Sequence, residues 1–298
     1  MAALSPIAII GFGEVGAILA RDLRAAGVGR IAAYDVLFDR PQSSPGRAAK
    51  AAGVQACASA SEAARGAALV ISAVTAAKAL EAARSVVPGI GPGVWFLDLN
   101  SASPGTKRAA GQAIEAAGAR YVEAAVMAPY PAKGVRTPML LGGPHARAFL
   151  AAAAFMDLDA KAFSETVGQA SAAKMCRSVM IKGTEALLAE CLLTARRYGV
   201  EKTVLASLSD MLPSPDWERL ARYMIARSLV HGKRRAEEMR EVAKTVREAR
   251  VEPWMSAAAA ERQDWAAEQA ERMPPEALEE QDLQILLDAI LKAMLAEA

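Results

Sequence analysis

A lysine that follows a run of small residues is the first candidate for chemistry in this chain. Lys174 follows a group of small residues that leave almost no side-chain bulk beside it: Gly168, Ala170, Ser171, Ala172 and Ala173. A lysine that becomes partly desolvated can have a lowered pKa and can exchange a proton near neutral pH. A lysine that lays its stem along a helix surface and keeps its ammonium in water would do no such chemistry. This stretch alone leaves both interpretations open.

A glycine-rich turn near the N-terminus is the second candidate. It follows an apolar run at residues 7–10 and precedes a helical pattern that ends near Gly27. In a dinucleotide-binding βαβ unit, the first glycine permits the tight turn, the second lets the backbone approach a pyrophosphate, and the third lets the helix pack on the strand. The pyrophosphate rests on the helix N-terminus. The residues of the turn are Gly11, Phe12, Gly13, Glu14, Val15 and Gly16.

An acid stands where the second strand of such a unit would deliver one. The apolar run Ile31–Tyr34 ends at Asp35, about 20 residues beyond the glycines, as the motif requires. Asp35 can accept a hydrogen bond from a ribose 2′-hydroxyl, whereas a 2′-phosphate would meet like charge. No basic residue follows directly in Val36-Leu37-Phe38, so we expect NAD in preference to NADP, and Arg40 is the residue that counts against this preference. The alternatives are a structural glycine turn and an ordinary turn residue at Asp35.

Two further strand ends carry candidate contacts. The runs at residues 69–74 and 94–97 are apolar throughout, as in strands that are buried on both faces of a parallel sheet. Ligands bind beyond the carboxyl ends of strands in such sheets. The residues that we expect there are Val74, Thr75 and Asn100 beside the cofactor and Ser101 beside the substrate.

The remaining patterns alternate between strand and helix as far as residue 167. In chain order we expect a loop at residues 36–50, a strand at 54–56, a helix from Ser103 to Gly118, strands at 121–126 and 139–141, a helix at 145–156 and a strand near Phe163. Beyond them we expect only helices, at residues 168–198, from Ser214-Pro215, at 232–250, and after Pro253 and Pro274-Pro275. The prediction is an α/β Rossmann-type N-terminal domain followed by an all-α C-terminal domain. The NAD(P)-binding domain would cover residues 1–167, and a helical substrate and dimerisation domain would cover residues 168–298.

Composition limits the partners. The 298 residues carry a net charge of +2, with acids and bases interspersed, so there is no basic surface of the kind that nucleic acid or an anionic membrane requires. The chain lacks a signal-peptide pattern and a membrane-spanning apolar run, so we expect a cytoplasmic protein with a small-molecule substrate. Its three cysteines and two histidines have no metal-ligand spacing, and we expect no metal site.

The helical half also bears on assembly and charge. Its first helix presents leucines on more than one face, which one neighbouring domain does not readily cover, so we expect a homodimer. We interpret residues 233–235, Lys-Arg-Arg, as a solvated helix face rather than an anion clamp, because Arg234 and Glu238 are spaced as a surface pair. The leucines are Leu187, Leu188, Leu192 and Leu193.

Three motifs together resemble the β-hydroxyacid dehydrogenase and 6-phosphogluconate dehydrogenase superfamily. IAIIGFGEVG is similar to its dinucleotide motif, LDLNSASP to its strand-end motif beside the nicotinamide, and GQASAAKMCRS to its catalytic helix. The resemblance puts Lys174 on the catalytic lysine. It implies NAD-dependent hydride transfer at a hydroxyl-bearing carbon of a small polar substrate, with the active site between the two domains. The C-terminal part resembles a subgroup of 6-phosphogluconate-dehydrogenase-like proteins that has a distinct C-terminal domain.

Departures from the superfamily pattern keep two alternatives open. Met127, Ala128 and Pro129 stand where a serine and two glycines usually hold the substrate carboxylate, and Ser178 stands where an asparagine usually binds substrate. We retain Met127 and Ser178 as candidate substrate contacts. An imine reductase on the same scaffold needs no carboxylate-binding serine and is the first alternative. A non-catalytic NAD-binding protein is the second, although such a protein needs no proton-handling lysine.

Overall fold

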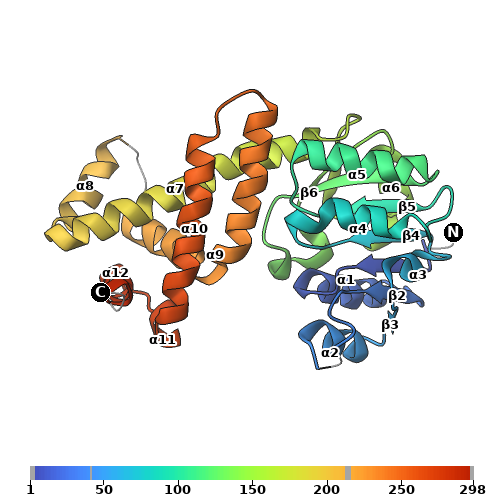
Figure 1. The fold of residues 1–298 in the computed structure, drawn as a ribbon, viewed down its shortest axis with the longest axis horizontal. Coiled ribbons are helices and arrows are strands. Elements are labelled where there is room, and N and C mark those ends of the chain that lie inside the picture. Colours follow the sequence, from blue (N-terminus) through green and yellow to red (C-terminus); the bar gives the residue numbers. More distant parts are fainter. Residues whose placement is uncertain (1–3, 41, 212–215, 296–298) are drawn as a thin grey trace. The chain divides into compact units, whose positions relative to one another are not determined.

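The structure is a computed structural model that describes residues 4–40, 42–211 and 216–295. The chain forms two compact units, Met1–Met175 and Cys176–Ala298 (Figure 1). Helix α7 (Gln169–Tyr198) contributes its first turns to the first unit and the rest of its length to the second. Lys174 and its neighbours therefore belong to the unit that contains the sheet.

An eight-stranded sheet organises the first unit. Its order is β3-β2-β1-β4-β5-β6-β7-β8, and all neighbouring strands are parallel except β6 and β7. Strand β1 lies between β2 and β4, so the chain reverses its direction of winding there, which is the point at which such sheets bind ligands. The strands are β1 (Ile7–Ile10), β2 (Ile31–Tyr34), β3 (Gln55–Ala56), β4 (Leu69–Ser72), β5 (Trp95–Asp98), β6 (Arg120–Val126), β7 (Met139–Gly142) and β8 (Ala160–Ser164).

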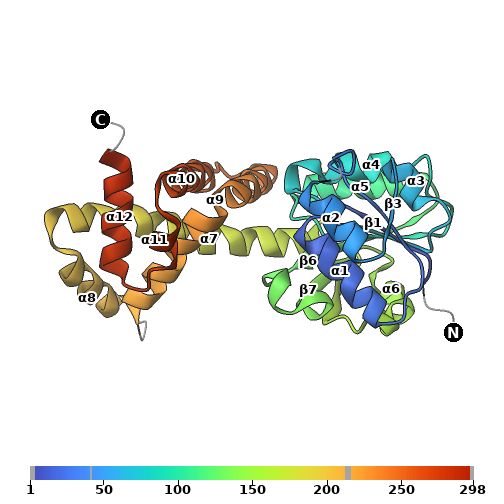
Figure 2. The ribbon, with the colours of Figure 1, turned by 90° about the horizontal axis from the view of Figure 1, so that it is seen from below.

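Helices cover both faces of this sheet. Figure 2 shows α3, α4 and α5 on one side of it and α1 and α6 on the other. Because side chains alternate along a strand, Ile7 and Ile9 enter the core under α1 and α6, while Ala8 and Ile10 enter the core under α3 to α5. The helices are α1 (Glu14–Ala25), α2 (Ser44–Ala51), α3 (Ala60–Ala64), α4 (Ala79–Val86), α5 (Pro104–Ala116) and α6 (Ala146–Ala152), with 3-10 turns at Ala76–Lys78, Tyr130–Ala132, Gly134–Arg136 and Ala154–Met156.

One predicted loop is a helix. Residues 36–50 contain enough Pro, Ser, Gly and Arg to suggest a loop, yet α2 begins within them. Ser43 Oγ accepts a hydrogen bond from Gly46 N at 3.1 Å, and Pro45 occupies the first turn. A serine N-cap and a first-turn proline are helix-start signals, which the overall composition of the segment concealed.

The second unit contains helices and no strand within residues 176–211 and 216–295. Its core is apolar, with Leu192, Ile225 and Leu286 all fully buried. The predicted combination of a Rossmann-type α/β region and a helical C-terminal region is confirmed. Besides α7, the helices are α8 (Glu201–Met211), α9 (Trp217–Glu248), α10 (Trp254–Arg272), α11 (Pro275–Glu279) and α12 (Leu283–Leu295).

Helix α9 is longer than predicted. Gly232 was expected to start a new helix, but α9 passes through it without a break. The other expected start, Ser214-Pro215, lies outside the described residues. A Cβ on Gly232 would lie 2.4 Å from Gln263 O and 2.9 Å from Ala267 Cβ. This glycine therefore serves the close packing of α9 on α10 rather than a helix end.

Candidate active site

The turn between β1 and α1 has the backbone that a dinucleotide site needs. Gly11 has a φ of +89°, and a Cβ there would lie 2.4 Å from Ala73 O. A Cβ on Gly16 would lie 2.3 Å from Gly11 O, so the fold itself requires glycine at both positions. A Cβ on Gly13 would meet no heavy atom within 4 Å. Space therefore remains at Gly13 for a group from outside the protein.

Helix α1 begins at this turn with no side chain to cap it. Gly13 is its N-cap, and Glu14 and Val15 form the first turn, Glu14 exposed and Val15 half-buried. An uncapped helix N-terminus offers backbone N–H donors and the positive end of the helix dipole to an anion. The residues present thus fit a dinucleotide pyrophosphate.

Asp35, at the end of β2, holds the turn in place. Its Oδ2 accepts a hydrogen bond from Phe12 N at 2.8 Å, and its Oδ1 accepts one from Leu37 N at 2.9 Å. The Phe12 ring is buried and packs on Phe38, with 6.0 Å between ring centroids. A carboxylate has about four acceptor sites, so Asp35 can hold the turn and still accept from a ribose hydroxyl. The structure joins the glycine turn and the acid that the sequence singled out.

The ends of β4 and β5 are braced against each other by Asn100. Its Oδ1 accepts from Val74 N at 2.7 Å, and its Nδ2 donates to Ser72 Oγ at 2.9 Å. Val74 also borders the glycine turn, because a Cβ on Gly11 would lie 2.8 Å from Val74 Cγ1. Thr75 is exposed. Asn100 thus positions the backbone of Val74 at the edge where the glycine turn lies.

Lys174 meets the end of β5. The half-buried Lys174 donates a hydrogen bond from Nζ to Ser101 Oγ at 2.5 Å. The two residues are 73 positions apart in the chain and both belong to the first unit. The structure therefore places the predicted proton-handling lysine beside the predicted substrate-contacting serine, next to Asn100.

A buried charge cluster under this edge was missed from the sequence. Lys107 Nζ lies 2.9 Å from Asp98 Oδ1 and donates to Asp98 O at 3.0 Å, and both side chains are 1 % exposed. Tyr121 OH donates to Asp98 Oδ2 at 2.7 Å. Burial and the adjacent Asp98 charge raise the pKa of the Tyr121 phenol well above its ordinary value. A charged residue inside an otherwise apolar strand was the available sequence signal.

Glu123 was also missed from the sequence, although it too is a charged residue inside an otherwise apolar strand. It lies in the middle of β6, is fully buried, and is the register partner of Asp98 on β5. Its carboxylate accepts from Gly168 N and Ser171 N, both at 2.5 Å, at the start of α7. It is therefore connected through α7 to Lys174.

The two remaining predicted substrate contacts lie in different units. Met127 follows β6 in the first unit, is half-buried, and donates from its backbone N to Pro138 O at 2.8 Å. Ser178 lies on α7 one helical turn after Lys174, in the second unit. Ser178 Oγ accepts from Lys182 Nζ at 3.2 Å, and the same ammonium lies 2.8 Å from Glu238 Oε2. Burial lowers the pKa of Lys182, and the charge of Glu238 opposes this shift.

Residues 233–235 are only partly the solvated face that was predicted. Lys233 pairs with Glu271, and Arg234 Nη1 lies 2.7 Å from Glu238 Oε1, all on exposed or rim positions of the second unit. Arg235 is instead 4 % exposed and pairs with the buried Glu185. The periodicity of the exposed pairs did not reveal that the third cation of the run points inward.

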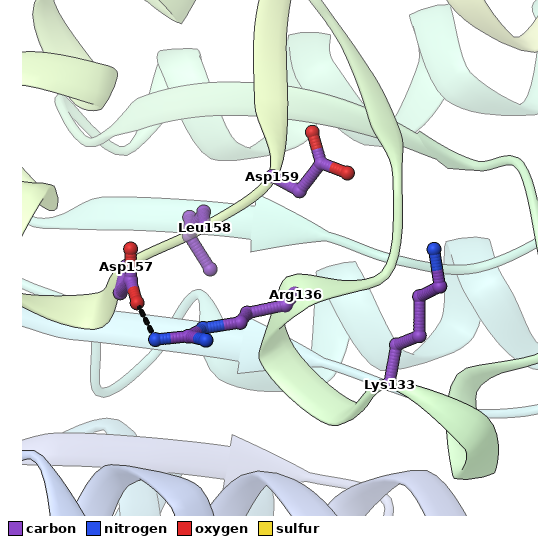
Figure 3. A pocket seen from close by; sticks show the side chains of 5 residues that line it. All are labelled: Lys133, Arg136, Asp157, Leu158 and Asp159. Carbon is purple, nitrogen blue, oxygen red and sulfur yellow. Dashed lines mark hydrogen bonds and ion pairs between the residues drawn. The ribbon is translucent and has the colours of Figure 1, made fainter.

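A surface cavity of about 600 Å³ lies elsewhere on the first unit, beside the turns that precede β7 and β8. Figure 3 shows Arg136 and Asp157 meeting there, with Lys133 apart from them. Asp159 is its second acid, so the lining has two acids and two bases and favours neither cation nor anion. Among the residues that the structure describes, no three His, Cys, Asp or Glu side chains could hold a metal ion. Within the same residues, no helix is both long and apolar enough to span a membrane.

Family models agree with this geometry. Residues 6–168 match the NAD binding domain of 6-phosphogluconate dehydrogenase. The chain belongs to this family. Residues 195–266 match a domain of unknown function, DUF1932. The resemblance drawn from the three sequence motifs is thereby confirmed, and the first unit is an NAD(P)-binding domain of the 6-phosphogluconate dehydrogenase type.

Solved structures extend the comparison to the whole chain. A conserved hypothetical protein from Sinorhizobium meliloti 1021 is 35 % identical, with a TM-score of 0.75, over 98 % of this chain and 97 % of that one. The conserved protein MTH1747, of unknown function and structurally similar to 3-hydroxyacid dehydrogenases, is 32 % identical, with a TM-score of 0.68, over 89 % and 97 %. Mycobacterium tuberculosis 3-hydroxyisobutyrate dehydrogenase, solved with L-serine, shares the fold at 18 % identity and a TM-score of 0.70, over 95 % and 97 %.

Proposed function

We propose that this member of the 6-phosphogluconate dehydrogenase-type family is an NAD(P)-dependent oxidoreductase that transfers a hydride between the nicotinamide and a hydroxyl-bearing carbon of a small polar substrate. The observation that carries the proposal is the 2.5 Å hydrogen bond between Lys174 Nζ and Ser101 Oγ. This contact supports the proposal because a lysine amine, which can exchange a proton, lies beside a hydroxyl at the strand edge where doubly wound sheets bind ligands. An NAD-binding sensor would have no need of that pair.

Lys174 is the general acid and base in this proposal. A bound nicotinamide supplies or accepts the hydride. When hydride leaves the substrate carbon, its hydroxyl must lose a proton, and the neutral amine of Lys174 takes it and becomes an ammonium; in reduction the ammonium returns the proton to the substrate oxygen. Ser101 Oγ, already an acceptor from Lys174, orients the Lys174 nitrogen and can donate to the substrate oxygen in turn. A positioned acid or base of this kind typically accelerates the reaction by about 10² to 10⁴.

The glycine turn and Asp35 hold the dinucleotide. The N–H groups at the start of α1 bind the pyrophosphate over Gly13, where a Cβ would find open space. Asp35 accepts from the adenosine ribose through the acceptor sites that Phe12 N and Leu37 N leave free. The carboxylate repels a 2′-phosphate, so we propose NAD as the preferred cofactor. Val74, Thr75 and Asn100 border the nicotinamide side.

Substrate contacts come from Ser101, Met127 and Ser178. Met127 is apolar where the superfamily pattern has a carboxylate-binding serine, so we propose that the substrate is not anchored through a carboxylate at that position. Ser178 carries a hydroxyl that Lys182 already polarises from 3.2 Å. A polar group of the substrate at Ser178 would therefore meet a donor network rather than a single hydroxyl.

We also propose that the protein is a homodimer. Of the four leucines, Leu188, Leu192 and Leu193 are buried within the second unit, and Leu187, which is 57 % exposed, is the one that a partner subunit could cover. Leu187 lines a groove of about 720 Å³ between α7 and α10 together with Met255 and Trp265. Sedimentation at micromolar concentration tests this proposal. The wild type should be a dimer and Leu187→Glu a monomer, and a monomer for the wild type as well would refute the proposal.

A substrate panel tests the proposed reaction and separates it from the alternatives. Purified protein is incubated with NAD or NADP and hydroxy acids or polyols, and separately with NADH or NADPH and cyclic imines, while nicotinamide absorbance is followed. Turnover of the hydroxyl compounds is expected. Turnover of imines alone would make the protein an imine reductase, and cofactor binding without any turnover would favour a non-catalytic role.

A further inference from the structure

We propose that Glu123 is a positioning residue, which caps the start of α7 and thereby fixes Lys174 against Ser101. Its role for catalysis rests on the proposed function, since it acts only through Lys174. The contacts that carry it lie entirely within the first unit.

The geometry is that of a carboxylate cap supplied from a distant strand. Glu123 Oε2 accepts from Gly168 N at 2.5 Å and Oε1 accepts from Ser171 N at 2.5 Å. Gly168 directly precedes α7, which begins at Gln169, so one carboxylate takes two of the N–H groups that a helix leaves unpaired at its start. A negative charge at this end is also stabilised by the helix dipole. No residue of the helix itself has to supply the cap.

Space around Glu123 is restricted in a way that keeps the carboxylate in place. A Cβ on Gly142, the register partner of Glu123 on β7, would lie 2.7 Å from Glu123 Oε2. Gly168 has a φ of +103°, and a Cβ there would lie 3.0 Å from Arg108 Nη1. Gly142 thus leaves room for the Glu123 carboxylate, and Gly168 leaves room for Arg108 of α5. The carboxylate cannot rotate away without losing both helix contacts.

On the neighbouring strand β5, Asp98 holds the Ser101 side of the Lys174–Ser101 contact in a similar way. Asp98 is the register partner of Glu123, and its Oδ1 accepts from Asn100 N at 2.9 Å, directly before Ser101. Two adjacent buried carboxylates therefore fix the two ends of the Lys174–Ser101 contact: Asp98 fixes the strand end and Glu123 fixes the helix. Lys107 pairs with Asp98, and the first turn of α7 offers Glu123 two backbone N–H donors and the positive end of a helix dipole.

Glu123→Gln tests the proposal without any substrate. The side-chain length is kept, but one acceptor becomes an NH₂ group that faces a backbone N–H. Hydrogen exchange, read by mass spectrometry on a peptide of residues 165–175, should become about ten- to a hundredfold faster, the range expected for losing a charged hydrogen bond. Exchange in β1 and β4 should not change, which separates loss of the cap from a general loss of stability.

A double-mutant cycle of Ser101→Ala and Glu123→Gln, read by the chemical reactivity of Lys174, gives a result that a purely structural role of Glu123 would not change. Mass spectrometry follows the rate at which acetic anhydride labels Lys174. Ser101→Ala should change this rate severalfold in the wild type and have little effect in Glu123→Gln, because the contact is already lost there. Glu115→Gln is the control: Glu115 lies on α5, its Oε1 accepts from Tyr121 N of β6 at 3.0 Å, and its carboxylate also pairs with His145, so it holds β6 through a carboxylate whose partners are not on α7.

Unchanged exchange in residues 165–175 of folded Glu123→Gln, or an equal effect of Ser101→Ala in both backgrounds, would overturn the proposal. Should Glu123→Gln not fold, Glu123→Asp is measured in the same way. It retains the buried charge but is one methylene too short to reach both N–H groups, so exchange in residues 165–175 should still accelerate; wild-type exchange and coupling would overturn the proposal. None of these readouts requires turnover, so they stand even if Lys174 proves not to be catalytic.

Discussion

Two glycines of the β1–α1 turn distinguish what a ligand requires from what the fold requires. A Cβ at Gly13 meets no heavy atom within 4 Å, and the backbone there, with φ −70° and ψ −156°, is accessible to alanine. A Cβ at Gly16 would lie 2.3 Å from Gly11 O and 3.2 Å from Gly11 C. The first substitution therefore leaves the packing intact, and the second forces helix α1 away from the turn.

The two alanine variants should separate stability from cofactor affinity. Gly16→Ala should lower the free energy of unfolding by about 1–3 kcal/mol, because overpacking against backbone exceeds the gain of about 1 kcal/mol in helix propensity. Gly13→Ala should change it by less than about 1 kcal/mol, the loss of a glycine N-cap. Gly13→Ala should nevertheless weaken NAD binding at least about tenfold, or ~1.4 kcal/mol, because the methyl group takes the space of the pyrophosphate.

Urea unfolding followed by circular dichroism gives the stabilities, and calorimetric titration of the folded variants gives the NAD affinities. Wild-type NAD affinity in Gly13→Ala would refute the placement of the pyrophosphate at Gly13. A Gly16→Ala variant at least as stable as the wild type would refute the packing argument.

Three further predictions concern the helices, the cofactor and pH. Gly232→Ala should destabilise the second unit by about 1–3 kcal/mol in urea unfolding. Gly183→Ala, where a Cβ meets nothing within 4 Å, should instead stabilise it by up to about 1 kcal/mol. Equal effects of the two substitutions would contradict the close α9–α10 contact. Asp35→Ala should shift the ratio of NAD to NADP affinity at least about tenfold towards NADP in paired titrations, and an unchanged ratio would show that Asp35 does not select the cofactor. Burial lowers the pKa of Lys182 from its ordinary 10.5. Between the folded and unfolded pKa values the unfolded chain therefore binds more protons than the folded one, so the free energy of unfolding rises with pH in that window. Lys182→Met should flatten this rise in urea unfolding at alkaline pH, and an unaltered slope would contradict the burial effect.

The elements that could be predicted from the sequence are those that local pattern determines. The run of four apolar residues at Ile7–Ile10 and the glycines after it specified β1 and its turn, and the small-residue run around Lys174 lies in α7 as expected. The α2 helix was missed because composition outweighed its start signals at Ser43 and Pro45. Gly232 was misread because a glycine at a helix end and a glycine at a helix–helix contact look the same in one chain.

The site was predictable only as far as its ligand-facing residues. Glycine spacing, Asp35 and the residues after β5 each carry a local signal, so Ser101 and Lys174 could be singled out separately. Their meeting depends on Asp98 and Glu123, which lie in adjacent strands whose pairing joins segments remote in the chain. Arg235 was likewise assigned to the surface because only its partner Glu185, on another helix, shows that it is buried. Buried polar contacts between distant segments have no periodic signature in sequence.

The single-turnover rate of hydride transfer in Lys174→Met measures the role of Lys174 most directly. It is followed by nicotinamide absorbance with a saturating concentration of a substrate from the panel. Methionine keeps an apolar stem of similar length and removes the nitrogen that donates to Ser101. We predict that NAD affinity is retained while the rate falls by at least about two orders of magnitude. A Lys174→Met rate near that of the wild type would contradict the assignment of Lys174 as the general acid and base.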